Sequence, residues 1–208
     1  MTRVPECERL DALCQPDRAY WGRDHILLAG MDEVGRGPLA GPVVACCAAM
    51  PPEPLIERVD DSKKVPEARR KALFPLLTET ALGYALGWVW PDAIDELNIL
   101  NATKLAFQQA FDAMPVCVSD VLVDAVQGLN ISARQHAIVH GDALSYSIAC
   151  ASIIAKVARD RYMTEQDALY PEYGFARNKG YGTAEHIAAL RRYGPCPIHR
   201  KSFIGKFV

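Results

Sequence analysis

The sequence has no hydrophobic run long enough to cross a membrane. Its longest apolar stretch, roughly residues 43–50, is far shorter than the ~20 residues that a transmembrane helix needs. The first fourteen residues also lack the apolar core of a signal peptide. These absences argue against a membrane protein and against a secreted one, and we expect the protein to be cytoplasmic.

Paired cysteines of the kind that bind zinc or carry redox chemistry are missing as well. The chain has seven cysteines, an odd number, and none of them forms a CxxC pair. Most stand among apolar residues, where cysteine behaves as a small hydrophobic side chain. We therefore expect reduced thiols.

Internal repeats, low-complexity segments and a clear interdomain linker are absent too. Half of the 208 residues are hydrophobic, enough for a folded chain with one substantial core. We predict an N-terminal extension over residues 1–24, forming a short helix that docks on the body, and a single domain over 25–208. The C-terminal part of that domain, from about residue 165, should be helical.

An excess of charge of one sign is also lacking, because the net charge is only −2. This balance argues against binding to nucleic acid through overall charge. Residues 151–208 nevertheless hold ten Lys and Arg against five Asp and Glu, whereas residues 1–150 hold 13 against 20. An acidic pocket beside a basic surface suits a metal-dependent enzyme acting on a polyanion. A chance distribution over a solvated surface is the alternative.

Hydrophobic patterns and turn residues predict strands that alternate with helices. The stretch 26–47 is typical of a strand, a glycine-rich loop and a second strand, and further strands are predicted over 82–90, 120–124 and 137–140. Helices are predicted over 66–77, 91–97, 99–113, 144–168 and 184–192. Small residues fill the first half of the long fourth helix, so another element could pack closely against it. This order favours an α/β fold with a mixed sheet flanked by helices.

Four acidic residues are candidates for a metal site. Asp32 and Asp124 each end a predicted buried strand, Glu33 follows Asp32, and Asp142 stands where the long helix should begin. Because successive strand residues point to opposite faces, we expect the strand to end at Asp32 and Glu33 to lie in the following loop. If the two strands are neighbours, these oxygens would suit Mg²⁺ or Mn²⁺. Two such ions can activate a water and stabilise the leaving oxygen of a phosphodiester.

Each acid also has a purely structural explanation. Asp142 could cap a helix, and for that residue alone the cap is the better explanation. Asp124 could be a turn residue at a strand end. Asp32 with Glu33 could form a solvated turn, although five mostly apolar residues precede them. Spacing alone is compatible with a metal site without deciding it.

Two glycine-rich segments could contact a sugar-phosphate backbone. Gly35-Arg36-Gly37 offers exposed backbone N–H groups around one guanidinium, since glycine allows close approach. Tyr181, flanked by glycines, could stack on a sugar or base, or pack at the rim against a neighbouring helix. The basic residues that could bind phosphates, or else be solvated surface charges, are Lys63, Lys64, Lys156, Arg177, Lys179, His199, Arg200 and Lys201.

Several motifs together resemble the bacterial ribonuclease HII family, the type 2 ribonucleases H. The resemblance extends over nearly everything from Leu28 to Phe203, and its first and fifth motifs are long and specific. The motifs are AGMDEVGRGPLAGPV (29–43), DDSKK (60–64), IDELNILNAT (94–103), VLVD (121–124), GDALSYSIACASIIAKVARDRYM (141–163), YPEYGFARNKGYGT (170–183) and HRKSF (199–203).

The resemblance implies a ribonuclease H-like fold, a five-stranded mixed sheet with helices on both sides and a helical C-terminal part. It also implies an endonuclease that hydrolyses the RNA strand of RNA·DNA hybrids. Such an enzyme would incise DNA on the 5′ side of a single embedded ribonucleotide and leave 3′-hydroxyl and 5′-phosphate ends.

The resemblance further implies roles for individual residues. The family's four acidic residues, which bind Mn²⁺ or Mg²⁺, match Asp32, Glu33, Asp124 and Asp142. The loop that reads the ribose 2′-hydroxyl, the group that distinguishes RNA from DNA, matches Gly35, Arg36 and Gly37. Tyr181 matches the tyrosine that supports this reading, and Lys63 with the basic C-terminal region would hold the backbone.

One segment departs from the family's pattern. After the third acid the family commonly continues with Gly-Asn, whereas Ala125-Val126 follows Asp124 here. Because the acid is retained, the catalytic interpretation stands, but metal preference and turnover could differ. Asp160 resembles a fifth acid, yet Lys156 precedes it by four residues in a predicted helix, so an ion pair is the better interpretation.

Two other functions compete with the two-metal ribonuclease. A nuclease of the same fold could act on another substrate, as a resolvase or exonuclease does, although Tyr181 and the loop at 35–37 argue against it. The altered segment after Asp124 could instead leave a catalytically silent duplex-binding protein, but a binding module has no reason to gather negative charge beside phosphates. The expected partners are RNA·DNA hybrids and DNA with embedded ribonucleotides, and we expect a monomer.

Overall fold

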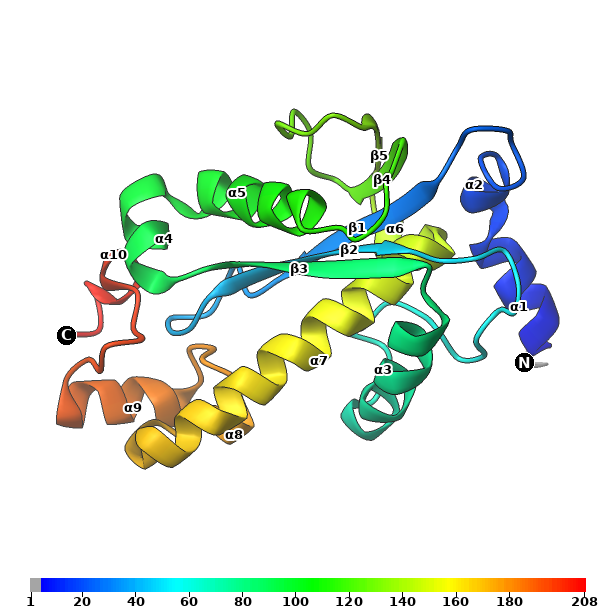
Figure 1. Cartoon of the computed structure of the whole chain (residues 1–208). Coiled ribbons are helices and arrows are strands. Elements are labelled where there is room, and N and C mark those ends of the chain that lie inside the picture. The colour runs from blue at the N-terminus through cyan, green and yellow to red at the C-terminus, as the bar shows by residue number, and fades with distance from the viewer. Residues whose placement is uncertain (1–4) are drawn as a thin grey trace.

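The computed structural model describes residues 5–208, and its centre is a five-stranded mixed sheet (Figure 1). The strands are β1 (Leu28–Val34), β2 (Val43–Ala49), β3 (Gly83–Val89), β4 (Asp120–Asp124) and β5 (Arg134–Ile138), in the order β3-β2-β1-β4-β5. β2 is antiparallel to β1 and to β3, whereas β4 runs parallel to β1 and to β5. The α/β fold expected from the sequence is confirmed.

One face of the sheet is covered by α5 (Ile99–Asp112), which follows α4 (Pro91–Leu97). The buried side of α5 consists mainly of small residues and one aromatic ring, and it packs on β2 and β3. A Cβ atom on Gly87 of β3 would lie 1.9 Å from the carbonyl oxygen of Ala106, so the helix rests almost directly on the strand. The predicted helices over 91–97 and 99–113 are confirmed.

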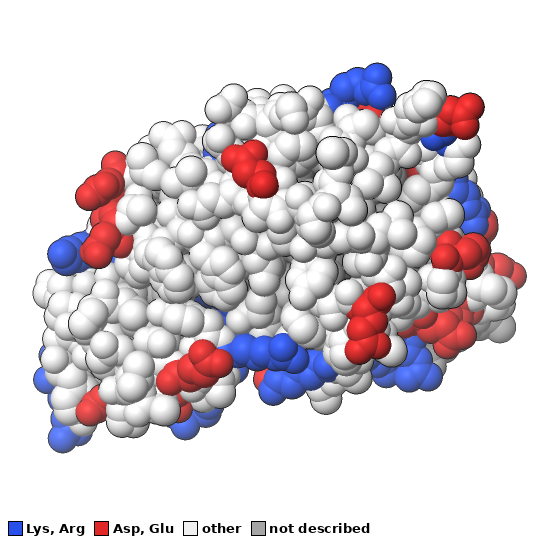
Figure 2. Space-filling view, in the orientation of Figure 1, with Lys and Arg blue, Asp and Glu red and all other residues white. Residues whose placement is uncertain are grey.

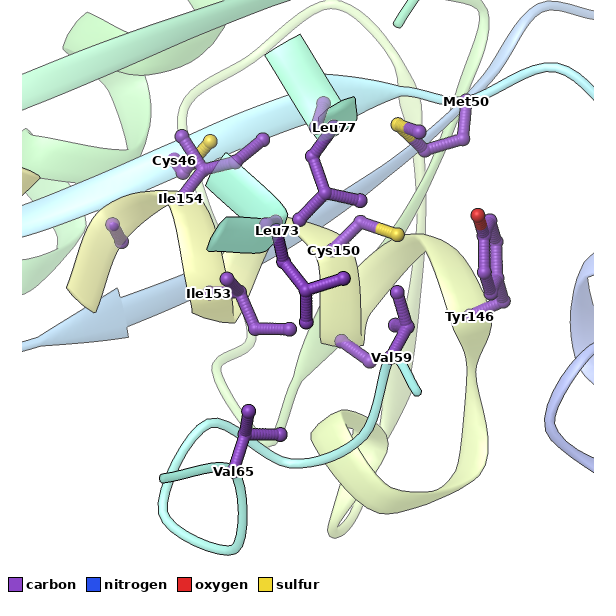
Figure 3. Packing of buried hydrophobic residues seen from close by; sticks show 14 of the residues in the cluster. Cys46, Met50, Val59, Val65, Leu73, Leu77, Tyr146, Cys150, Ile153 and Ile154 are labelled. Atoms are coloured by element: carbon purple, nitrogen blue, oxygen red, sulfur yellow. The ribbon is translucent and has the colours of Figure 1, made fainter. Parts of the chain in front are cut away.

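The other face carries the long helix α7 (Tyr146–Leu169) and, outside it, α3 (Glu67–Thr80). Figure 3 shows Leu73 and Leu77 of α3 close to Ile153 and Ile154 of α7, with Cys46 of β2 beside Ile154. These side chains are buried, and their apolar surface holds α3, α7 and the sheet together.

Small residues let α7 lie unusually close to β1. A Cβ atom on Gly30 would come within 2.1 Å of the backbone carbon of Ser147, so only glycine fits at this strand position. The close packing expected from the small half of the helix is therefore confirmed. Since residues two apart on a strand face the same way, Asp32 also faces α7.

The C-terminal helical part lies at the far end of α7 (Figure 1). It contains the short helices η1 (Pro171–Tyr173), α8 (Phe175–Asn178), α9 (Ala184–Tyr193) and α10 (Lys201–Ile204). Its core includes Leu39 and Ala40 from the loop after β1, and Ala40 forms an isolated bridge with His199. This part of the chain therefore packs on the loop that also carries residues 35–37.

Three boundaries predicted from the sequence are wrong. β1 continues to Val34, because residues 32–34 pair with residues 44–46 of β2. β5 begins three residues earlier than predicted, since its pairing with β4 starts at Arg134. The long helix is preceded by a separate short helix, α6 (Gly141–Leu144), because Ser145 adopts an extended backbone between the two.

The predicted N-terminal helix is two short helices, α1 (Glu6–Leu13) and α2 (Gln15–Arg18), and residues 1–4 of the predicted extension lie outside the described part. Leu10 and Leu13 join the core around α3 and α7. No helix within residues 5–208 combines the length and apolarity needed to cross a membrane. Figure 2 shows that the middle of the face over β3 and α5 carries few charges, while charged residues of both signs lie along the lower margin of the same view.

Candidate active site

The carboxyl ends of β1 and β4 open onto one cleft. Their parallel pairing ends at Met31 and Val123, so Asp32 and Asp124 follow at the same level of the sheet. The cleft has a volume of about 220 Å³ and is lined by Asp32, Glu33, Val34, Gly35, Arg36, Gly37, Ser62, Lys63, Asp124, Ser152, Lys156 and Tyr181. The predicted metal-binding acids, the loop of residues 35–37, Lys63 and Tyr181 all line this cleft except Asp142, whose carboxylate contacts Lys63 of the lining.

Asp32 is buried at the bottom of the cleft, with only 4% of its surface exposed. Its Oδ1 accepts a hydrogen bond of 2.8 Å from the backbone N–H of Glu33. Burial raises the pKa of Asp32 well above its ordinary value, and the charges of Glu33 and Asp124 raise it further. A cation bound here would offset both the lost hydration and the repulsion between the acids.

Glu33 lies inside β1, contrary to the expectation that the strand ends before it, and it still reaches the cleft. It lines the cleft together with Asp32 and Asp124. Its Oε1 lies 3.3 Å from Nη1 of Arg36, whereas Oε2 is buried without a hydrogen-bond partner among the described residues. Burial raises the pKa of Glu33, and the Arg36 charge partly offsets that rise.

Asp124 and Asp142 are joined through the start of α6. The N–H of Gly141 donates to Oδ1 of Asp124 at 2.8 Å, which ties the end of β4 to the helix. Burial raises the pKa of Asp124, and the charge of Asp142 adds to the rise. Asp142 is itself buried, and its Oδ2 lies 3.1 Å from Nζ of Lys63. The N-cap of α6 is His140 and Asp142 stands in the first turn, so the prediction that Asp142 is the cap residue is wrong.

The glycine-rich loop and Tyr181 lie next to each other at the other end of the cleft. A Cβ atom on Gly37 would meet Cε1 of the Tyr181 ring at 3.9 Å. Nζ of Lys156 lies 6.0 Å from the centre of that ring. It also donates to Asp160 at 2.7 Å, so the ion pair predicted from the sequence is confirmed.

Two serines of the cleft were not anticipated from the sequence. The hydroxyl of Ser152, on α7, donates to the hydroxyl of Ser62 at 2.8 Å, and both side chains are buried. Ser62 stands inside the DDSKK motif and Ser152 within the small half of α7, which are the signals that could have pointed to them. Serine is common in both turns and small helix faces, so neither signal is specific.

Three of the basic residues considered for phosphate binding are buried instead, namely Lys179, His199 and Arg200. Nζ of Lys179 donates to Oγ1 of Thr164, 3.1 Å away, and Nδ1 of His199 accepts from the N–H of Cys196. These side chains bind to the protein itself, and the expectation of a direct phosphate contact is wrong for them.

The acidic end of the cleft suits a hard divalent cation in its chemistry. Its donors are carboxylate oxygens, and Oε2 of Glu33 is buried with no partner of its own within residues 5–208. No three His, Cys, Asp or Glu side chains of the described chain are already gathered tightly enough to hold a metal ion. Lys63 and Arg36 each pair with one of the acids, Asp142 and Glu33 respectively.

The family model of ribonuclease HII matches residues 29–206 of the chain. The chain belongs to the ribonuclease HII family. A curated ribonuclease HII from Desulfitobacterium hafniense (strain DSM 10664 / DCB-2) is 51% identical over 201 residues, which cover 97% of this chain and 77% of the relative.

Solved structures of the wider family share the fold. The ribonuclease H2 from Pyrococcus horikoshii OT3 is 28% identical, with a TM-score of 0.73 that covers 86% of this chain and 96% of that one. Bst-RNase HIII, solved in complex with Mn²⁺, is 18% identical and has a TM-score of 0.63 over 93% of this chain and 68% of its own. As a member of this family the chain is a type 2 ribonuclease H, a nuclease with a ribonuclease H-like fold.

The departure from the ribonuclease HII pattern after Asp124 has a backbone consequence. Ala125 has φ +50°, in the left-handed region that glycine enters without steric cost. An alanine here therefore adopts a backbone conformation that favours glycine. The turn is held by the N–H of Ala125, which donates to the carbonyl oxygen of Ile138.

Proposed function

We propose that this enzyme hydrolyses the RNA strand of RNA·DNA hybrids and incises duplex DNA on the 5′ side of a single embedded ribonucleotide. The products would carry 3′-hydroxyl and 5′-phosphate ends. One observation carries the proposal: a single cleft holds buried acids at one end and the loop of residues 35–37 with Tyr181 at the other. The acidic end suits phosphodiester hydrolysis, and the glycine-rich end suits a sugar that is approached closely.

We propose Asp32, Glu33, Asp124 and Asp142 as the residues that would hold Mg²⁺ or Mn²⁺. When bound, two such ions would supply an activated water and charge stabilisation for the leaving oxygen. The raised pKa of Asp32 and the partnerless Oε2 of Glu33 support this assignment, because both features are relieved by a cation. The Mn²⁺ complex of Bst-RNase HIII is in keeping with it.

The remaining residues of the cleft would bind and orient the substrate. The backbone N–H groups at 36 and 37 would contact the ribose 2′-hydroxyl and its phosphate, and the Tyr181 ring would pack beside the sugar. The Lys63 side chain is 78% exposed, so it can leave Asp142 for a backbone phosphate at little cost. Lys156 would contribute a second positive charge from α7.

The proposal is tested with a labelled DNA duplex that carries one ribonucleotide, incubated with Mn²⁺, with Mg²⁺ or with chelator. An all-DNA duplex and an RNA·DNA hybrid are run in parallel. We expect a metal-dependent nick on the 5′ side of the ribonucleotide, cleavage of the hybrid and no cut in the all-DNA duplex.

Cleavage of the all-DNA duplex would point to a nuclease with another preference. Binding without a nick under either metal would point to a silent duplex-binding protein, and it would direct attention to the segment after Asp124. Expression as a monomer in the cytoplasm stays a prediction, which gel filtration and cell fractionation check.

A further inference from the structure

Two arginine side chains are completely buried behind the recognition end of the cleft, Arg159 on α7 and Arg200 at the start of α10. Arg159 donates through its three nitrogens to the carbonyl oxygens of Pro42, Lys179 and Ala40. Both arginines direct all their guanidinium nitrogens to backbone carbonyls. Burying a guanidinium with no carboxylate partner costs desolvation free energy. In return, the hydrogen bonds hold the backbone segments whose carbonyls they reach.

Arg200 contacts the glycine-rich loop directly. Its Nη2 donates to the carbonyl oxygen of Gly35 at 2.6 Å, and its Nη1 donates to that of Arg36 at 2.9 Å. Its Nε donates to the carbonyl oxygen of Gly41, also at 2.9 Å. One planar side chain therefore fixes two successive peptide groups of the loop and the point at which the loop returns towards β2.

These contacts determine where the loop's N–H groups point. In a trans peptide the C=O and the following N–H point in opposite directions. Because the carbonyls of Gly35 and Arg36 face Arg200, the N–H groups of Arg36 and Gly37 face away from it, and residues 35–37 line the cleft. Neither N–H donates to any backbone carbonyl within residues 5–208. They are a pair of adjacent donors available to a ligand.

An arginine suits this task better than a lysine. Its fork presents several donors in one plane, whereas a lysine ammonium could satisfy the carbonyls only one at a time. Burial lowers the pKa of Arg200 to about 9, which still leaves it charged at neutral pH. Its charge therefore lies directly behind the two outward N–H groups and strengthens their attraction for a phosphate or a hydroxyl oxygen.

We propose that Arg200 is a positioning residue for sugar discrimination, holding the peptide groups of residues 35–37 so that the N–H groups of Arg36 and Gly37 meet the ribose 2′-hydroxyl and its phosphate. The proposal rests on the proposed function, since it assigns the means by which the same cleft tells RNA from DNA. Arg200 itself does not touch the substrate.

The test compares binding of two duplexes, one with a single ribonucleotide and one of DNA alone, in chelator so that no cleavage occurs. Arg200→Lys keeps the charge and loses the planar fork. We expect the preference for the ribonucleotide duplex to fall by at least about tenfold, the effect of losing one or two hydrogen bonds. Arg200→Gln, which also loses the charge, should lose the preference and bind both duplexes more weakly.

The matched control is Ile204→Ala, which opens a cavity in the same C-terminal segment and removes no hydrogen bond to the loop carbonyls. It should lower the melting temperature and leave the ratio of the two affinities unchanged, because a smaller folded fraction affects both duplexes equally. An unchanged ratio in Arg200→Lys would overturn the inference. A wild-type protein without any preference would overturn the proposed function, and the inference with it.

A second measurement needs no substitution and therefore does not depend on the variants folding. Amide hydrogen exchange of Arg36 and Gly37 is followed in the wild-type protein with each duplex. We expect both amides to exchange rapidly in the free protein and to become protected by the ribonucleotide duplex more than by DNA. Equal protection by the two duplexes would overturn the assignment of these N–H groups to the ribose, and the inference about Arg200 with it, whereas a changed affinity ratio in Arg200→Lys tests Arg200 alone.

Discussion

The imidazole rings of His186 and His199 are joined through their Nε2 atoms, which lie 3.0 Å apart inside the C-terminal helical part. Nδ1 of His199 accepts from the N–H of Cys196, so its Nε2 carries the proton and donates to His186. Nδ1 of His186 then donates to the carbonyl oxygen of Tyr181 at 2.9 Å. This series of hydrogen bonds requires both imidazole rings to be neutral. It ends at Tyr181, which lies beside the glycine-rich loop.

This histidine pair predicts a loss of stability in mild acid. Burial lowers the pKa of His199 to about 4 and also lowers that of His186. An unfolded histidine takes up a proton near pH 6.5, so between about pH 6.5 and 4 the unfolded state binds more protons and stability falls as the pH falls. For His199 alone the loss from pH 7.5 to 5 should be about 2 kcal/mol.

Urea unfolding of the wild type and of His199→Gln at the two pH values checks this prediction. The buried carboxylates shift in the opposite direction, so the quantity of interest is the difference between the two proteins. The wild type should lose about 2 kcal/mol more than the variant on acidification. Equal pH slopes would show that the pair is not held neutral in the folded protein.

Asp32→Asn should abolish cleavage and stabilise the protein in chelator. Burial and the neighbouring Glu33 charge raise the pKa of Asp32, so its charged form destabilises the folded state at neutral pH. The amide keeps the oxygen that accepts from Glu33, and the gain should be about 1 kcal/mol or more. Duplex binding should be unchanged or tighter, because a negative charge beside phosphates is removed.

Thermal unfolding in chelator, a binding assay and a cleavage assay test these three statements on one sample. Asp112→Asn, at the exposed end of α5, is the matched control and should change none of them. A destabilised Asp32→Asn protein would contradict the assignment of this residue to a strained acidic site.

Asp17 should be important for stability although it does not line the cleft. It is buried, and its two carboxylate oxygens accept from the N–H groups of Tyr146 and Ser147 at 3.0 and 2.9 Å, which start α7. Asp17→Ala leaves both donors buried without a partner, so we expect a loss of about 2–3 kcal/mol. Asp17→Asn should lose less. Asp24→Ala, an exposed site on the same segment, should be neutral in the same denaturation series.

Ala125→Gly should stabilise the turn after Asp124. An alanine at φ +50° carries a steric cost that glycine lacks, which is worth up to about 1 kcal/mol after the greater freedom of unfolded glycine is counted. Ala113→Gly, where φ is −87°, should give no gain. The difference in unfolding free energy between the two substitutions measures the steric cost of the left-handed backbone at Ala125. A loss of stability in Ala125→Gly would show that the turn is not strained.

Most elements of the fold could be predicted from the sequence because they depend on local patterns. The helices over 91–97 and 99–113 and the strand over 120–124 follow from hydrophobic period and from Pro91, and the structure has them within a residue. The predicted strand at 137–140 was displaced because its start is set by pairing with β4, which no short-range pattern encodes. The extension of β1 through Glu33 has the same cause, since β2 continues beside it.

By itself, the sequence determined the order of the elements, the acids at two strand ends and the motifs of the family, since each depends on neighbouring residues in the chain. Only the tertiary structure decided how distant groups are used. It brought Glu33 into the cleft, placed Asp17 as an acceptor for the first N–H groups of a helix 129 residues away, and buried Arg200 beneath the loop. The physical reason is that burial and hydrogen-bond partners arise from packing between distant segments. The sequence therefore suggests a surface charge for Arg200, whereas in the fold its side chain is buried and holds the loop backbone.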